Sequence, residues 1–190
     1  MPVNETPTLP GLTCGQRRDK RTGEVQPWYT HPALDVLETW DLTGKVVLEW
    51  GGGHSTLWWA RRAKHVFTIE GDPAWGDFIR QGGAPNVTLI DKTLSGEDIR
   101  LHPAHYTTIP PGCTPDVVAI DDNHRTACLK AALGLPRPFV LIIDNWQQDY
   151  VYLDAEAAAL MAPFRGRFFI QGDHRDHEGR PWQTAIWELS

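Results

Sequence analysis

Cysteine is scarce in this sequence of 190 residues, which contains only Cys14, Cys113 and Cys128. These three are far apart, and none belongs to a C-x-x-C pair. An odd number at such spacing argues against a disulfide framework and against a thiolate zinc site. The cysteine usage therefore fits a reducing compartment best.

Long hydrophobic runs are absent as well. No stretch approaches the roughly 20 apolar residues that a membrane-spanning helix requires. The opening stretch, MPVNETPTLPGLTCGQRRDKRTG, has polar residues and prolines where a secretory signal needs an apolar block. We therefore expect a cytoplasmic protein without a membrane partner.

Positive charge is in the minority. The sequence has 18 Lys and Arg residues against 24 Asp and Glu residues, which gives a formal net charge of -6. Because no overall field attracts phosphate backbones, binding to nucleic acids is disfavoured.

Hydrophobic residues make up 41% of the chain, which is enough for the core of one domain and too little for two comfortable ones. Residues 1–27 are rich in Pro, Thr, Gly and charged side chains, and we expect them to form a flexible N-terminal extension. The folded domain is predicted to span residues 28–190 and to begin with a helix whose apolar stripe runs from Leu34 to Trp40.

Short apolar runs alternate with helical segments from residue 45 onward. This alternation is the signature of parallel strands joined by crossover helices. The last two apolar runs are too close together for a helical crossover, so they are predicted to pair antiparallel. The predicted fold is α/β, a Rossmann-like doubly wound and mostly parallel seven-stranded sheet with an antiparallel C-terminal strand. Strands are expected at 45–50, 65–70, 86–91, 115–122, 138–144, 167–172 and 184–189, and helices at 55–63, 73–81, 125–133 and 153–162.

The stretch LEWGGGHS follows the first of these strands and places three glycines at its carboxyl end. In open α/β sheets this turn is the usual ligand anchor, and a side chain at Gly52 or Gly53 is expected to occupy ligand space. A dinucleotide fingerprint would need a glycine at Thr56, and Glu49 would set a carboxylate beside a pyrophosphate, which is the wrong sign. S-adenosylmethionine resolves this conflict because it carries an ammonium and a sulfonium group and no phosphate.

At these residues the sequence resembles class I S-adenosylmethionine-dependent methyltransferases. Their first motif is a strand-end acid followed by G-x-G, and Glu49, Gly51 and Gly53 match it. Ser55 stands where a third glycine is common. The resemblance implies that Glu49 faces the methionine amino end and that Gly51, Gly52, Gly53 and Ser55 contact the cofactor.

A second acid, Glu70, stands at the end of the next predicted strand, HVFTIE. Its two oxygens match a vicinal diol, so it is predicted to bind the ribose hydroxyls, with Asp72 or Trp75 near the adenine. Two other interpretations stay open: the glycines form a plain tight turn beside a surface Glu70, or the protein is an NAD(P)-dependent Rossmann oxidoreductase.

Acids also follow the fourth and fifth predicted strands, in AIDDNHR and LIIDNW. We take Asp121, His124 and Asp144 as candidate catalytic residues, and Asp121 as a further cofactor contact. The first of these segments lacks the prolines and the aromatic residue of the Asn- or Asp-Pro-Pro-aromatic motif, which disfavours methylation of nucleic-acid bases.

The same strand ends resemble catechol-type O-methyltransferases, which hold magnesium with an Asp after the fourth strand and an Asp-Asn pair after the fifth. The resemblance implies that Asp121, Asp144 and Asn145 bind Mg²⁺, which would lower the pKa of an acceptor hydroxyl. The metal-free alternative uses His124 as general base, oriented by Asp121 or Asp122, with Arg125 holding an anionic substrate.

The sequence thus predicts an S-adenosylmethionine-dependent methyltransferase that modifies a small-molecule acceptor at a hydroxyl oxygen. A cofactor-binding module without catalysis is the alternative from a different class. The acids after the fourth and fifth strands distinguish the two, because a binding module does not need them.

Overall fold

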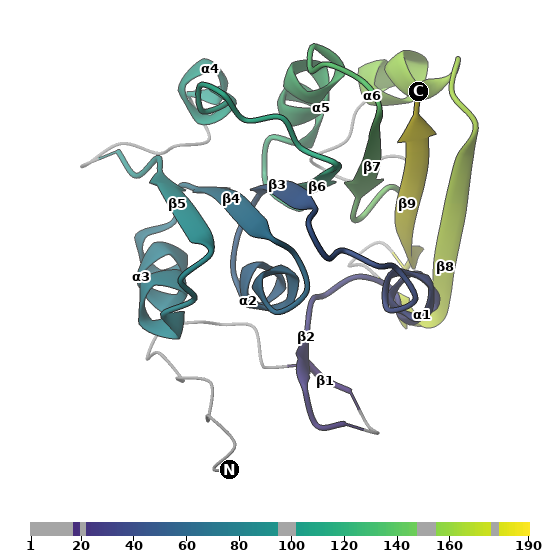
Figure 1. Ribbon diagram of the computed structural model, residues 1–190. Coiled ribbons are helices and arrows are strands. Elements are labelled where there is room, and N and C mark those ends of the chain that lie inside the picture. The colour runs from purple at the N-terminus through teal and green to yellow at the C-terminus, as the bar shows by residue number, and fades with distance from the viewer. Residues whose placement is uncertain (1–16, 20–21, 95–101, 148–154, 176–178) are drawn as a thin grey trace.

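The computed structural model describes residues 17–19, 22–94, 102–147, 155–175 and 179–190. None of the helices in these residues is long and apolar enough to cross a membrane. The elements, labelled in Figure 1, are β1 (Arg17–Arg18), β2 (Val25–Gln26), α1 (His31–Leu37), β3 (Val46–Trp50), α2 (His54–Ala60), β4 (His65–Glu70), α3 (Pro73–Gly82), β5 (Val87–Asp91), α4 (Pro103–Tyr106), β6 (Val117–Ile120), α5 (Arg125–Leu133), β7 (Phe139–Ile143), α6 (Ala155–Met161), β8 (Gly166–Arg175) and β9 (Pro181–Leu189).

Seven strands form the main sheet, in the order β5-β4-β3-β6-β7-β9-β8 (Figure 1). The pairs among β5, β4, β3, β6 and β7 are parallel. β9 is antiparallel to both of its neighbours, β7 and β8. The predicted fold, a mostly parallel sheet with an antiparallel C-terminal strand, is confirmed.

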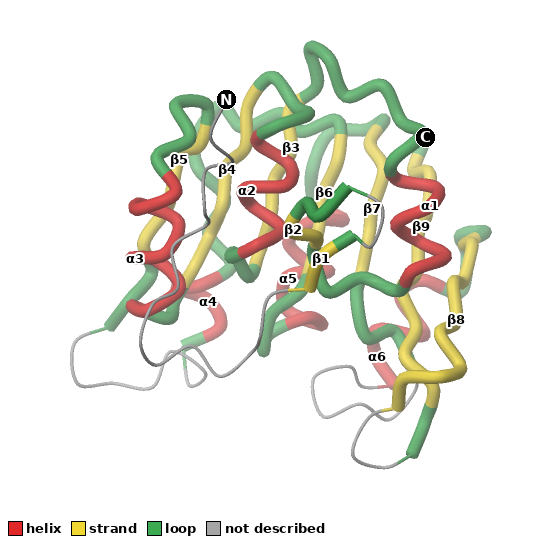
Figure 2. The backbone as a smooth tube through the Cα atoms, turned by 90° about the horizontal axis from the view of Figure 1, so that it is seen from below, coloured by secondary structure: helices red, strands yellow, loops and turns green. Residues whose placement is uncertain are grey.

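Helices cover both faces of the sheet: α1, α2 and α3 lie on one side, and α4, α5 and α6 on the other (Figures 1 and 2). Each face therefore has its own hydrophobic core. Successive residues of β3 point to opposite cores. Val47 packs in the core beneath α1 and α2, and Leu48 packs in the core beneath α5 and α6. Burial on both faces explains why the strands read as unbroken apolar runs.

The short helix α4, in the connection between β5 and β6, was not predicted. A helix of four residues is too short to show a hydrophobic period. Its Tyr106 is buried, and the hydroxyl donates a hydrogen bond to the Ile69 carbonyl at 3.2 Å. This contact fixes the connection over the carboxyl end of β4.

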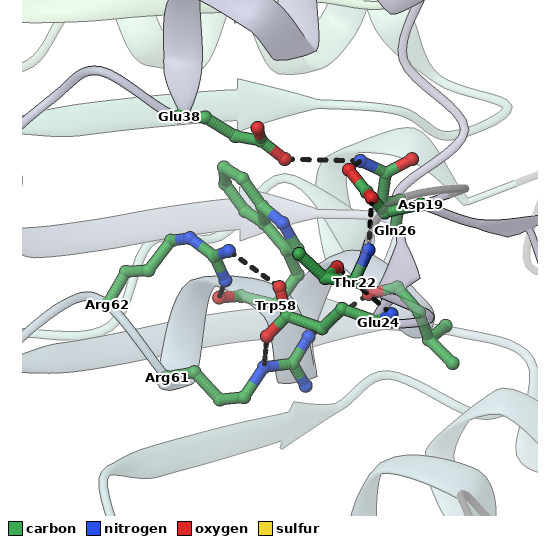
Figure 3. Close-up of polar contacts among 9 residues, drawn as sticks. Asp19, Thr22, Glu24, Gln26, Glu38, Trp58, Arg61 and Arg62 are labelled. Carbon is green, nitrogen blue, oxygen red and sulfur yellow. Dashed lines mark hydrogen bonds and ion pairs between the residues drawn. The ribbon is translucent and has the colours of Figure 1, made fainter.

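Part of the expected flexible extension is folded, because β1 and β2 form an antiparallel hairpin. Figure 3 shows its anchors: Glu24 accepts hydrogen bonds from Arg61 Nε at 2.8 Å and Arg62 Nη2 at 2.9 Å, and Gln26 Nε2 donates to Glu38 Oε1 at 3.1 Å. The hairpin is tied by polar contacts to the ends of α1 and α2. Because such contacts follow no hydrophobic period, sequence reasoning missed them.

Candidate functional site

A cavity of about 650 Å³ lies at the carboxyl ends of β3, β4 and β6. The glycine turn, the start of α3, the β5–β6 connection and the loop before α5 form its walls. Its lining residues are Gly51, Gly52, Glu70, Gly71, Asp72, Pro73, Trp75, Thr93, Leu94, Tyr106, Asp121, Asp122, Asn123 and His124.

The lining is acidic. Four carboxylic acids contribute to it, and no Lys or Arg of the described residues does. The described lining offers phosphate groups no cationic partner, whereas a ligand with positive charge would favour the ionised forms of these acids.

Gly51 and Gly52 line the cavity with their backbone. Neither position has room for a side chain. Gly51 has a φ of +82°, and a Cβ there would lie 2.0 Å from the Asp121 carbonyl oxygen. A Cβ at Gly52 would lie 2.4 Å from Thr68 Cγ2 and 2.6 Å from Ile79 Cδ1. The atoms in the way belong to the protein, so the expectation that a side chain at Gly52 would occupy ligand space is wrong.

Gly53 is buried and does not line the cavity. A Cβ at this position would lie 2.9 Å from the Trp75 ring. For Gly53, too, the added atom would meet protein before it met ligand.

Glu49 lies behind the glycine turn and is not part of the cavity lining. The Gly53 N–H donates to Thr56 Oγ1 at 3.0 Å, and the Thr56 hydroxyl donates to Glu49 Oε2 at 2.6 Å. Burial raises the pKa of Glu49 to about 7, against hydrogen bonds from Ser55 and Thr56 that lower it. Glu49 therefore holds the turn in shape, a role that Thr56 makes possible and that the motif alone did not reveal.

One oxygen of Glu49 is still unsatisfied: Oε1 is buried and has no hydrogen-bond partner. Buried carboxylate oxygens in native proteins normally have one. Ser55, the other predicted contact, is buried on the first turn of α2 and does not line the cavity.

Glu70 is the last residue of β4 and lines the cavity, as predicted. Its Oε2 accepts from the Gly52 N–H at 2.7 Å, and its Oε1 accepts from the N–H groups of Gly71 and Asp72 at 2.7 and 2.6 Å. Burial raises the pKa of Glu70 to about 8 despite these backbone hydrogen bonds. Glu70 thus joins the glycine turn to the start of α3, where Asp72 and Trp75 also face the cavity.

Asp121, Asp122 and His124 come from the loop after β6, and all three line the cavity. Asp122 accepts a hydrogen bond from Cys128 Sγ at 3.0 Å and another from the His124 backbone N–H. The His124 ring lies 5.3 Å from that of Tyr106, between centroids. Asp122 therefore fixes the His124 backbone.

Asp144 follows β7 and lies outside the cavity lining. It is buried, and its Oδ1 accepts a hydrogen bond from the Thr184 hydroxyl of β9 at 2.6 Å. Burial and the charge of Asp121 raise the pKa of Asp144 to about 8. Thr184 carried no signal in the sequence, because its partner belongs to a strand that is distant along the chain.

Arg125, the first residue of α5, is buried among the strand-end acids. Its Nη2 donates to Asp121 Oδ1 at 2.6 Å and to Asn145 Oδ1 at 2.7 Å, and its Nε donates to the Asp144 carbonyl oxygen at 2.8 Å. A further hydrogen bond runs from Nη1 to the Asp122 carbonyl. The interpretation in which Arg125 holds an anionic substrate does not suit a guanidinium that protein groups engage on three nitrogens.

The residues predicted to bind Mg²⁺ do come together, but their arrangement does not fit the ion. Asp121 Oδ1 and Asn145 Oδ1 both accept from Arg125 Nη2. Mg²⁺ needs oxygen ligands at about 2.1 Å, and a guanidinium among those oxygens would repel it. Within the described residues, no group of three or more His, Cys, Asp or Glu side chains could hold a metal ion.

No protein-family model matches the chain, and no curated protein matches its sequence. Solved structures do match. A methyltransferase-like protein from Silicibacter pomeroyi shares 20% identity over 87% of this chain and 89% of its own, with a TM-score of 0.60. A TehB-like SAM-dependent methyltransferase from Corynebacterium glutamicum shares 13% over 87% and 90%, with a TM-score of 0.56.

A SAM-dependent O-methyltransferase from Thermotoga maritima shares 12% identity over 87% of this chain and 68% of its own, with a TM-score of 0.56. The structural neighbours include class I, Rossmann-like methyltransferases, and at these identities the likeness shows the fold.

Proposed function

We propose that this protein is an S-adenosylmethionine-dependent methyltransferase that acts on a small molecule at a hydroxyl oxygen. The observation that carries the proposal is the cavity at the carboxyl ends of β3, β4 and β6, with four acids and no Lys or Arg of the described residues in its lining. These acids suit a nucleoside ligand with cationic groups, which would favour their ionised forms. The lining offers no cation of the described residues to the pyrophosphate of a dinucleotide, which disfavours an NAD(P)-dependent oxidoreductase.

The chain's own residues would hold the cofactor as follows. Glu70 is placed to accept hydrogen bonds from the ribose hydroxyls with lone pairs that the backbone amides leave open. The backbone of Gly51 and Gly52 allows close approach, and Asp72 and Trp75 border the adenine side. Glu49 would act on the amino end of the ligand through the glycine turn, which it supports through Thr56.

S-adenosylmethionine, when bound, supplies an electrophilic methyl group on a positively charged sulfur. His124 is the proton acceptor that the cavity offers, because its side chain lines the wall and imidazole is the commonest general base. His124 would take the proton of the acceptor hydroxyl as that oxygen gained the methyl group, and the neutral thioether of the cofactor would be the leaving group. Asp121 lines the cavity and is held there by its ion pair with Arg125, so it is placed to contact the ligand.

Calorimetry with S-adenosylhomocysteine and with NADH tests the cofactor assignment. Wild type should bind the first and not the second. Glu70→Ala should weaken binding by about 2 to 3 kcal/mol, because it removes charge-assisted hydrogen bonds to the ribose. Glu156→Ala, which changes an exposed acid on α6, is the matched control and should bind like wild type. Binding of NADH in place of S-adenosylhomocysteine would contradict the assignment.

Turnover separates an enzyme from a binding module. Wild type incubated with S-adenosylmethionine and a panel of phenols and alcohols should yield methylated products by mass spectrometry. His124→Ala should lower turnover by about 10²- to 10⁴-fold, the usual contribution of a general base, while S-adenosylhomocysteine binding stays within about twofold of wild type. A variant that keeps full turnover would remove His124 from the mechanism, and tight binding without any product would favour the binding module.

A further inference from the structure

The guanidinium of Arg125 lies at the point where the side chains after β6 and β7 converge. One nitrogen, Nη2, contacts oxygens from both strand ends, Asp121 Oδ1 at 2.6 Å and Asn145 Oδ1 at 2.7 Å. The Arg125 side chain is 5% exposed, so these contacts are made in a weakly screened interior.

The sheet register brings two acids together at this point. Ile120 pairs with Ile143 on the neighbouring parallel strand, so Asp121 and Asp144 leave the sheet side by side. Neighbouring strands are about 5 Å apart, and two carboxyl groups that close repel each other unless a cation or a proton intervenes. Arg125 supplies that cation from inside the chain.

The two acids are treated differently. The Asp121 carboxylate forms the ion pair with Arg125, whereas the Asp144 carboxyl receives the Thr184 hydroxyl and only its backbone carbonyl contacts Arg125. One guanidinium therefore fixes the Asp121 side chain, the Asn145 side chain and the Asp144 backbone together. A metal ion with several oxygen ligands could likewise hold all three groups together.

We propose that Arg125 is a built-in cation that takes the place of a divalent metal ion between β6 and β7. It is a positioning residue: it holds the strand-end groups, and it makes the reaction independent of a metal. The acceptor is then oriented by side chains and not by chelation, so a compound with a single hydroxyl serves as well as a vicinal diol. The statement about the acceptor rests on the proposed methyltransferase function, whereas the replacement of a metal ion by Arg125 does not.

Mn²⁺ binding, measured by electron paramagnetic resonance, tests without substrate or cofactor whether Arg125 replaces a metal ion. Wild type should show no bound Mn²⁺. Arg125→Ser, which vacates the site and leaves its oxygens, should bind a single Mn²⁺, and Mg²⁺ should raise its melting temperature. Both effects should disappear in the double variant Arg125→Ser with Asp144→Asn. Lys130→Ser removes an exposed cation from the same helix and should bind no Mn²⁺, as the matched control.

Two results would overturn the inference. The first is Mn²⁺ bound by wild type and lost in Asp144→Asn, because the metal site would then exist beside Arg125. The second is a folded Arg125→Ser that binds no Mn²⁺. If Arg125→Ser does not fold, wild type and Arg125→Lys decide: Arg125→Lys should fold without bound Mn²⁺, and a bound ion in either protein overturns the inference.

The substrate consequence has its own measurement. With chelator present, the methylation rates of a catechol and of the matched single phenol should both be unchanged. If the catechol methylation rate fell steeply in chelator and returned with Mg²⁺, the metal-independent orientation of the acceptor would be contradicted. Failure to bind S-adenosylhomocysteine would instead remove the proposed function and leave the Mn²⁺ result intact, so the two failures are distinguishable.

Discussion

Glu49 and Glu70 stand at comparable strand ends but do different work. Glu70 lines the cavity and accepts hydrogen bonds from three backbone N–H groups. Glu49 is fully buried and supports the turn through Thr56. The difference follows from side-chain direction, since Glu49 points toward α2 and Glu70 ends its strand beside the start of α3. A motif that records only the residue type does not distinguish these two roles.

The raised pKa of Glu49 makes the stability of the unliganded protein depend on pH. Its pKa rises from 4.5 to about 7, so the folded state binds the proton more tightly than the unfolded state does. The resulting stabilisation is complete below about pH 4.5 and is lost as the pH rises through about 7, with an upper bound of about 3 kcal/mol. Glu49→Gln should lose this dependence.

Urea denaturation at about pH 5 and about pH 8 checks this expectation through the unfolding free energy. Relative to wild type, Glu49→Gln should be more stable at the higher pH than at the lower one. Glu156→Gln, an exposed change on α6, should follow the wild-type curve at both values. Parallel curves for Glu49→Gln and wild type would show that Glu49 is ionised in both states.

At the scale of elements, the turn between β3 and α2 is packed from behind. Thr68 of β4 and Ile79 of α3 fill the space in which a Gly52 side chain would sit. The turn is therefore part of the contact between the first two βα units as well as a wall of the cavity. Its shape depends on both neighbours, so a change there acts on stability before it acts on a ligand.

Gly52→Ala should destabilise the protein by about 1 to 3 kcal/mol, the usual cost of forcing an extra carbon into a filled site. Thermal denaturation measures this loss. Gly172→Ala is the control, because nothing lies within 4 Å of its Cβ position. A Gly52→Ala protein as stable as wild type that fails to bind S-adenosylhomocysteine would restore the view that the Gly52 position faces the ligand.

At the scale of the whole molecule, sheet order decides where the site lies. β3 is the strand from which the chain turns in both directions, with β4 on one side and β6 on the other. The helices after β3 and β4 lie on one face of the sheet, and those after β6 and β7 lie on the other. The connections to these helices therefore diverge next to the end of β3, and the cavity lies between them. The acids after β4 and β6 meet at this point although about fifty residues separate them.

The antiparallel strands complete the molecule on the other side of the site. Thr184 of β9 donates to Asp144, and its Oγ1 also accepts from the Thr30 N–H just before α1. Gln171 of β8 accepts from the His31 N–H at 3.0 Å. The two C-terminal strands therefore hold the start of α1 against the end of β7, which gives them a part in shaping the site.

The sequence by itself determined the class of fold and the ends of the strands on which the acids stand. Apolar runs and glycines are local signals, and each follows from backbone geometry within a few residues. The predicted positions of Glu70, Asp121 and His124 around one cavity followed from a single rule, that parallel strands end at the same edge.

Only the tertiary structure decided what these side chains face. It placed Arg125 among the oxygens assigned to a metal, turned Glu49 to the back of the glycine turn, and placed β2 against the end of α2. Each outcome includes a contact between residues distant along the chain: Arg125 with Asn145, Thr68 with Glu49, and Arg61 with Val25. The energies of such contacts depend on burial and on direction. Sequence spacing records neither quantity, so the set of acids was predictable while the charge that joins them was not.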